Sequence, residues 1–95
     1  MDKENAIANL SNKIAGLFEL HGFNKELVND EVNFVRDGKY RKATYIKGFD
    51  GFVIEYADSF EEAKKNRYED GDCYPISLGN SLIYKLDEDI IKYMI

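Results

Sequence analysis

The first segment of the chain carries apolar residues at intervals of three and four positions, a spacing that places side chains on one face of a helix. Gly22 follows directly after His21, and glycine commonly ends a helix because it adopts the left-handed conformation without strain. The pattern predicts a helix from about Lys3 to about His21. Its buried stripe is formed by Ile7, Leu10, Ile14, Leu17 and Phe18.

Three stretches rich in β-branched and aromatic residues come next. Asp37-Gly38 separates the first two, and this dipeptide is a strong signal for a two-residue hairpin turn, in which both positions need a positive φ. A short loop, GFDG, separates the second and third. The pattern therefore predicts a three-stranded antiparallel meander. Its strands are EVNFVR at 31–36, KYRKATYIK at 39–47 and FVIEYA at 52–57.

Alternation of side chains along each strand divides this meander into two faces. Closing the hairpin at Asp37-Gly38 places Phe34 opposite Arg41, and this register assigns the remaining residues. The face expected to pack against the first helix collects Val32, Phe34, Ala43, Tyr45, Phe52, Ile54 and Tyr56. The other face collects Glu31, Asn33, Lys42, Thr44 and Glu55, with Val35, Tyr40, Ile46 and Val53 among them.

Two further helices are predicted after the meander. Ser59 and Glu62 have the spacing of a capping box, which favours a short helix that ends near Tyr68. From about Asn80 the apolar residues again follow helical spacing, at Leu82, Leu86, Ile90 and Tyr93. The predicted fold class is α+β: a three-stranded antiparallel meander with helices packed mainly on one face, in the order α-β-β-β-α-α. A short edge strand at 74–78 is compatible with this order.

Composition and length place the chain among folded proteins. The 95 residues fit a single domain, 1–95, and 44% of them are hydrophobic while only one is proline. One cysteine and a start, MDKENAIANL, that lacks a basic stretch followed by an apolar run favour a cytoplasmic protein. No apolar run reaches the roughly twenty residues of a membrane span, and no cofactor is expected.

Charge is unevenly distributed along the chain, whose net charge is -5. Residues 36–47 hold five basic residues and one acid, for a net of +4, whereas residues 55–72 hold three basic residues and seven acids, for a net of -4. The acidic segment ends in EDGDCYP at 69–75, which contains Glu69, Asp70 and Asp72. Gly71, Pro75 and the aspartates are typical of a helix end, a turn and the entry to a strand, and this structural interpretation is favoured.

Three kinds of partner are compatible with these features. Val35, Tyr40, Ile46 and Val53 form an apolar group on the outer sheet face, and such groups often mark a protein interface or a homodimer contact. If a later helix crosses to cover them, that interface disappears. The basic hairpin 36–47 could bind nucleic acid, although its bases are expected to pair with the acids of 55–72. A metal-dependent enzyme using the 69–72 carboxylates is the third hypothesis.

The hypothesis best supported by the sequence is a small acidic, non-enzymatic protein-binding module, of which an inhibitor or immunity-type protein would be one form. Its partner is expected to be a basic protein, because a net charge of opposite sign speeds encounter. The predicted partner-binding residues are the acids Glu69, Asp70 and Asp72 and the outer-face residues Tyr40, Val35, Ile46 and Val53. No catalytic residue and no metal ligand set is assigned.

Overall fold

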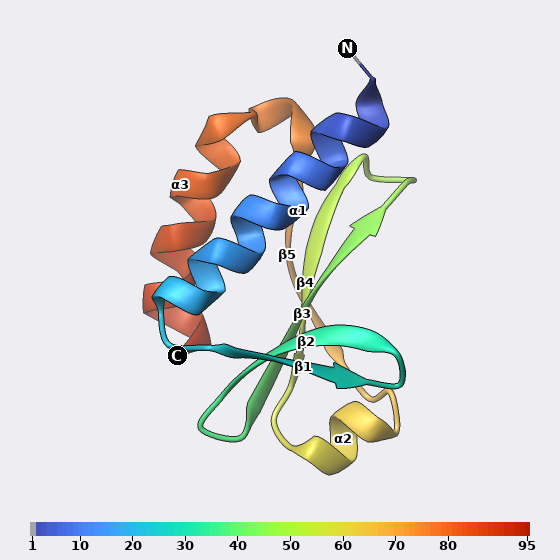
Figure 1. The fold of residues 1–95 in the computed structure, drawn as a ribbon, viewed down its shortest axis with the longest axis vertical. Helices are drawn as coiled ribbons and strands as arrows, with labels where there is room; N and C mark the ends of the chain where they lie inside the picture. The colour runs from blue at the N-terminus through green and yellow to red at the C-terminus, as the bar shows by residue number, and fades with distance from the viewer. Residues whose placement is uncertain (1) are drawn as a thin grey trace.

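The computed structural model describes residues 2–95 (Figure 1). It begins with helix α1, Lys3–Leu20, which buries Leu10, Ile14 and Phe18. The Asp2 side chain accepts a hydrogen bond from the backbone N–H of Glu4 at 3.1 Å and so caps the helix start. The helix ends before Gly22, whose φ is 85°. The predicted first helix is confirmed.

The sheet has five strands where the sequence predicts three. They are β1 (Asn24–Val28), β2 (Glu31–Arg36), β3 (Lys39–Ile46), β4 (Gly51–Ala57) and β5 (Glu69–Pro75). All neighbours pair antiparallel, and the order across the sheet is the order along the chain, β1-β2-β3-β4-β5. The α+β class is therefore confirmed, and the central three strands form the predicted meander. Strand β1 was missed, and β5 covers 69–75 where only a short edge strand at 74–78 was allowed for.

The register predicted for the first hairpin is confirmed. Phe34 pairs with Arg41 and Arg36 pairs with Lys39, while Asp37 and Gly38 have φ values of 51° and 75°. Across the next hairpin Tyr45 pairs with Phe52. The two faces of the sheet are therefore the predicted ones.

Strand β5 corrects the interpretation of EDGDCYP as a turn. Tyr74 pairs with Phe52 and is fully buried in the core, so the segment is held against β4 as an edge strand. A register shift between Val53 and Glu55 marks a bulge in this ladder. Turn-forming residues mislead here because an edge strand tolerates glycine, proline and acids on its open side.

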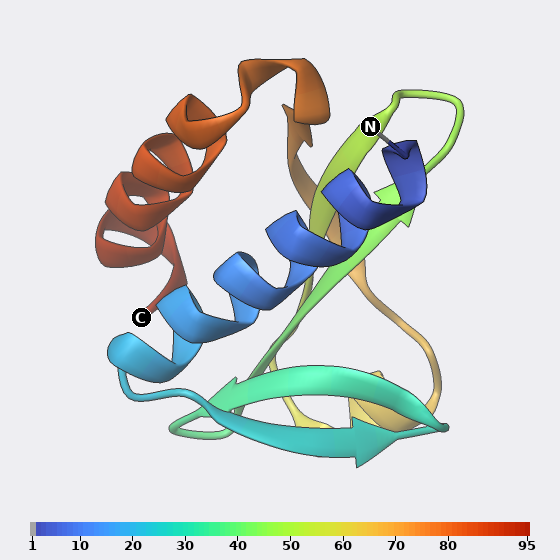
Figure 2. The same cartoon turned by 45° about the horizontal axis from the view of Figure 1, so that its top comes forward.

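The helices lie on both faces of the sheet (Figures 1 and 2). Helix α1 and the C-terminal helices, α3 (Asn80–Asp89) and the π-helical turn η2 (Ile90–Met94), cover the inner face. A short 3-10 turn, η1 (Ile76–Leu78), leads into α3. Helix α2 (Phe60–Lys64) is shorter than predicted and packs its Ala63 against the outer face. Its predicted cap is present, because Ser59 accepts a hydrogen bond from the Glu62 N–H at 3.2 Å.

The main core lies between the inner face of the sheet and the helices. Phe18 is central to it, stacked on Phe34 with ring centroids 4.6 Å apart and packed edge-on against Phe23 at 5.1 Å. A smaller cluster on the other face joins Val28, Val35, Tyr40, Ala57 and Ala63. Among residues 2–95 no helix has the length and apolar character needed to cross a membrane.

Candidate interaction surface

The apolar group predicted to be exposed on the outer face is covered. Val35, Tyr40 and Val53 are buried, and Ile46 is half-buried. Helix α2 supplies Ala63 and the segment after it supplies Tyr68, which pack against Val35 and Tyr40. The prediction of a solvent-exposed apolar patch is therefore wrong, and the proviso that a later helix would cross over it holds. The exposed apolar group that suggested a homodimer contact on this face is therefore not present.

Next to the covered group, the outer face holds a polar network around Lys42, which is only 7% exposed. The Lys42 ammonium lies 3.3 Å from a Glu31 carboxylate oxygen and 3.9 Å from one of Glu55. It also lies over the Tyr68 ring, 4.3 Å from the centroid. The Tyr68 hydroxyl donates to the buried Asn33 at 2.7 Å. Lys42 is thus neutralised inside the protein.

Arg41, the neighbouring base, points to the inner side of the sheet and is 5% exposed. Its guanidinium donates to the backbone carbonyls of Met94 and Tyr40, each at 3.3 Å, and lies 3.7 Å from the Asp58 carboxylate. Burial lowers the pKa of Arg41, and the charge of Asp58 opposes this shift. Its guanidinium also lies over the Tyr56 ring at 4.8 Å.

The basic hairpin is therefore largely committed to internal contacts. Arg41 pairs with Asp58, Lys42 contacts Glu55, and Lys39 donates to the terminal carbonyl of Ile95 at 3.0 Å. Both of these acids, Asp58 and Glu55, fall in 55–72, as predicted. A groove for nucleic acid needs basic side chains that reach phosphates, and the two at the middle of the hairpin cannot do so without leaving the interior.

The acids of residues 58–72 are situated differently. Helix α2 and the first half of β5 carry what we call the acidic surface, and all its side chains are exposed. Among residues 2–95 only one of its members, Asp58, takes part in a salt bridge. Lys64, Lys65 and Arg67 lie between them in the chain and reduce the net charge without cancelling it. The acidic surface comprises Asp58, Glu61, Glu62, Glu69, Asp70 and Asp72.

The strand geometry of β5 separates the three acids that the sequence placed together. Glu69 pairs with Tyr56 on the inner side, whereas Asp70 pairs with Glu55 on the outer side. Asp72 lies two positions before Tyr74, which pairs with Phe52, so it is on the inner side as well. Burial raises the pKa of the Tyr56 phenol, the charge of Arg41 opposes this shift, and the charge of Asp72 adds to it. Glu69 and Asp72 therefore share the Tyr56 side of the sheet, and Asp70 faces away from them.

On that side a cavity of about 250 Å³ opens into the acidic surface. Asp58 is fixed at its wall by Arg41, and Glu62 by its hydrogen bond to the Asp58 N–H at 3.3 Å. Carboxylates beside aromatic rings are suited to bind a guanidinium or ammonium group. The cavity is lined by Arg41, Tyr56, Asp58, Glu62, Glu69 and Tyr93.

Four of the residues that line the cavity were not predicted as partner-binding residues from the sequence. They are Asp58, Glu62, Tyr56 and Tyr93. The capping box did locate Glu62, but only as a structural residue. Tyr93 enters from the C-terminal turn, 35 positions beyond Asp58 by chain number. These elements come together only in the tertiary fold, so no local sequence pattern predicts the cavity.

The geometry gives the metal hypothesis no ligand set. Consecutive strand residues such as Glu69 and Asp70 point to opposite faces, so they cannot converge on one ion. Within residues 2–95, no three histidine, cysteine or acidic side chains are grouped as metal ligands would be.

Comparison of the chain with protein-family models, with curated proteins and with solved structures gives no match.

Proposed function

We propose that this protein is a non-enzymatic binding module whose acidic surface holds a basic partner protein in the cytoplasm. An inhibitor or an immunity-type protein, which covers the basic active surface of another protein, is one form of such a module. The observation that carries the proposal is the contrast in charge pairing. The bases Arg41 and Lys42 are buried and paired, whereas Glu61, Glu62, Glu69, Asp70 and Asp72 are exposed and make no salt bridge among the described residues.

Unpaired exposed carboxylates attract a basic partner over a distance set by ionic strength. The cavity next to Tyr56 adds a specific contact, because a basic side chain entering it meets Glu62, Glu69 and an aromatic ring together. The whole acidic surface steers the basic partner toward the protein, and the cavity selects which of its side chains is bound. Binding of this kind depends strongly on salt and on a few central residues.

A nucleic-acid binder through the hairpin 36–47 is the weaker proposal. Its two central bases are buried, and the acidic surface would repel a polyanion. It predicts that nucleic acid is bound and that charge reversal of Lys47, which remains exposed, weakens that binding.

The test compares three tagged baits in a native cell lysate, each at low and at high salt. The first bait is the wild type, and the second carries Glu62→Gln, Glu69→Gln and Asp72→Asn. The third is a matched control that removes the same charge from exposed positions elsewhere, Glu4→Gln, Asp30→Asn and Glu88→Gln.

We expect the wild type and the matched control to retain the same basic protein, and high salt to release it. The bait that lacks the three acids should not retain it. Retention of the same protein by all three baits, or recovery of nucleic acid alone, would contradict the proposal. A captured partner should then bind the purified wild type with an affinity that falls as salt increases.

A further inference from the structure

The β1–β2 hairpin at the open edge of the sheet carries two apolar side chains that the protein leaves exposed. Leu27 and Val32 pair with each other on the inner side of the sheet, yet they are 73% and 46% exposed. They are exposed because α1 and β1 diverge from the turn at Gly22, so the helix does not reach the far end of this hairpin (Figure 2). Exposed apolar residues on a sheet edge favour pairing with another strand.

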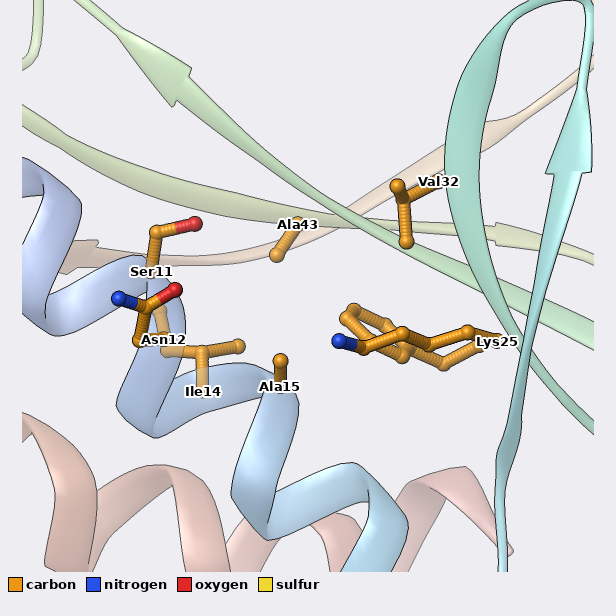
Figure 3. Close-up of a pocket in the computed structure, with 8 residues that line it drawn as sticks. Ser11, Asn12, Ile14, Ala15, Lys25, Val32 and Ala43 are labelled. Carbon is orange, nitrogen blue, oxygen red and sulfur yellow. The ribbon is translucent and has the colours of Figure 1, made fainter.

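A cavity of about 200 Å³ occupies the angle between α1 and the β1–β2 hairpin (Figure 3). Its floor is apolar, formed by Ile14, Ala15, Phe34 and Ala43, and Val32 lies at its side. Lys25 lines the rim, and its ammonium lies 3.4 Å from the Glu19 carboxylate. This base therefore has its counter-charge in the same chain, and Ser11 and Asn12 complete the lining with polar groups.

The backbone of β1 also directs hydrogen-bonding groups toward the open edge. Asn29 and Asp30, with φ values of 54° and 65°, form a two-residue turn that makes Val28 and Glu31 the first pair of the hairpin. In an antiparallel ladder closed by such a turn, the first pair exchanges hydrogen bonds and the next does not. The N–H and C=O of Leu27 therefore point away from β2, toward the open edge.

We propose that β1 pairs antiparallel with β1 of a second copy of this chain, with the two Leu27 residues opposite each other on the two-fold axis. In this register both Leu27 backbones exchange hydrogen bonds across the edge. The side chains Val32, Leu27 and their equivalents in the second copy form one apolar strip across the joined inner faces. The result is a symmetric ten-stranded sheet.

Charge supports a second copy in this register. Centring on Leu27 places Glu26 opposite Val28 of the second copy and Lys25 opposite its Asn29, so no like charges face each other. A shift of one position would place Glu26 opposite itself. The strand order also sets β5 at the far edge from β1, so the β5 acids of the two copies, Glu69, Asp70 and Asp72, lie at opposite ends of the joined sheet and repel little.

The first test is sedimentation equilibrium from low micromolar to near-millimolar protein. Five residues a side make a contact smaller than the roughly 1,200–2,000 Å² of a standard stable interface, so a weak, concentration-dependent dimer is expected. Leu27→Lys should weaken it at least tenfold, because a lysine at an edge opposes pairing. Leu20→Lys is the matched control, since Leu20 is 76% exposed on α1, and it should dimerise like the wild type. A wild type that stays monomeric throughout, or equal dimerisation of the two variants, overturns the proposal.

The second test fixes the register. Opposed residues of a hydrogen-bonded pair have Cα atoms about 5.5 Å apart, within the range of a disulfide. With Cys73→Ser removing the one native thiol, Leu27→Cys should form a disulfide-linked dimer under mild oxidation much faster than Leu20→Cys. Equal rates for the two cysteines would mean random collision and would refute pairing at Leu27.

Discussion

The two edge strands of the sheet are protected to different degrees. Strand β5 has three exposed acids, a bulge and a terminal proline, all of which discourage another strand from pairing with it. Strand β1 has no proline, no bulge in its ladder with β2, and an exposed Leu27. Lys25 and Glu26 give β1 some protection of the same kind, so β1 is the less protected edge rather than an unprotected one, and it is the edge for which we propose pairing.

The edges also differ in how they are anchored. Strand β5 is held by Tyr74, which is buried in the main core and whose hydroxyl donates to Asp89 at 2.6 Å. Strand β1 is held by Val28, which is buried in the smaller outer cluster. Strand β5, which bears Glu69, Asp70 and Asp72, is therefore anchored in the larger of the two cores, and β1 in the smaller.

The largest expected effect on stability comes from removing Tyr74, the residue that anchors β5 in the core. Tyr74→Ala should lower the free energy of unfolding by about 4 kcal/mol, because it leaves a cavity in the core and removes the partner of the Asp89 carboxylate. Val28→Ala should cost roughly 1–3 kcal/mol, since it removes only part of a smaller side chain. Urea unfolding of both variants measures the difference. Equal losses would show that the two edges are anchored equally.

The next effect concerns the close approach of β5 to Tyr56. A Cβ built on Gly71 would lie 2.5 Å from the Tyr56 ring, which also lies against the Arg41 guanidinium. Gly71→Ala should therefore cost roughly 1–3 kcal/mol, as overpacking does. Gly16→Ala is the control, because nothing lies within 4 Å of its added methyl group, and in the middle of α1 it should stabilise by about 0.5–1 kcal/mol. Thermal melting should move in opposite directions for the two variants.

A smaller effect depends on pH. The hydrogen bond from Tyr74 holds the pKa of the Asp89 carboxyl below its usual range, burial opposes this shift, and Lys85 at 3.3 Å lowers the pKa further. Since the folded pKa is depressed, the stabilisation is present above the unfolded pKa of about 3.9 and is lost as the pH falls through the folded value.

Tyr74→Phe should therefore cost about 2 kcal/mol near neutral pH, because it leaves the carboxylate with one fewer donor. The deficit relative to the wild type should shrink as the pH is lowered from about 7 to about 3, where the wild type also loses the contribution. Unfolding in urea at several pH values measures it. A deficit that stays constant over that range would mean that the hydroxyl does not act through Asp89.

How much of this fold the sequence predicts depends on how local each signal is. Helix α1, the Asp37-Gly38 turn and the register of Phe34 with Arg41 follow from spacing and turn chemistry within a few residues, and all three are confirmed. The edge strands are not local in this sense. Strand β1 has a polar sequence, NKELV, and β5 becomes a strand because Tyr74 finds a core site opposite Phe52.

The candidate interaction surface was likewise predicted only where the sequence signal is local. Charge counting alone located Glu69, Asp70 and Asp72, but it could not show that Asp70 faces the other side of the sheet. Covering of Val35 and Tyr40 by α2 depends on where the chain crosses after Ala57, which no residue pattern specifies. Leu27 was not predicted as a binding residue, because a single leucine in a polar stretch is common in sequences. It becomes a candidate only because it lies on an open sheet edge.

The sharpest way to test the contrast between the edges is to exchange their properties, which should scarcely change monomer stability. Leu27→Lys and Asp72→Leu both alter exposed side chains, so each should shift the free energy of unfolding of the monomer by only about 0.5 kcal/mol. Their effects on association should nevertheless be opposite. Leu27→Lys removes pairing at β1, whereas Asp72→Leu places an apolar residue on the edge that the acids protect and should increase concentration-dependent association.

Light scattering across a concentration series measures both variants and the double variant. If protection of β5 comes from its acids, the double variant should associate through β5 and differ from the wild type in its sensitivity to salt, because the remaining Glu69 and Asp70 charges still repel at low ionic strength. If Asp72→Leu leaves association unchanged, the bulge, Pro75 and the two remaining acids are sufficient to protect that edge. Asp72 would then have no protective role of its own, and the proposed binding of a basic partner would remain as the explanation for its position.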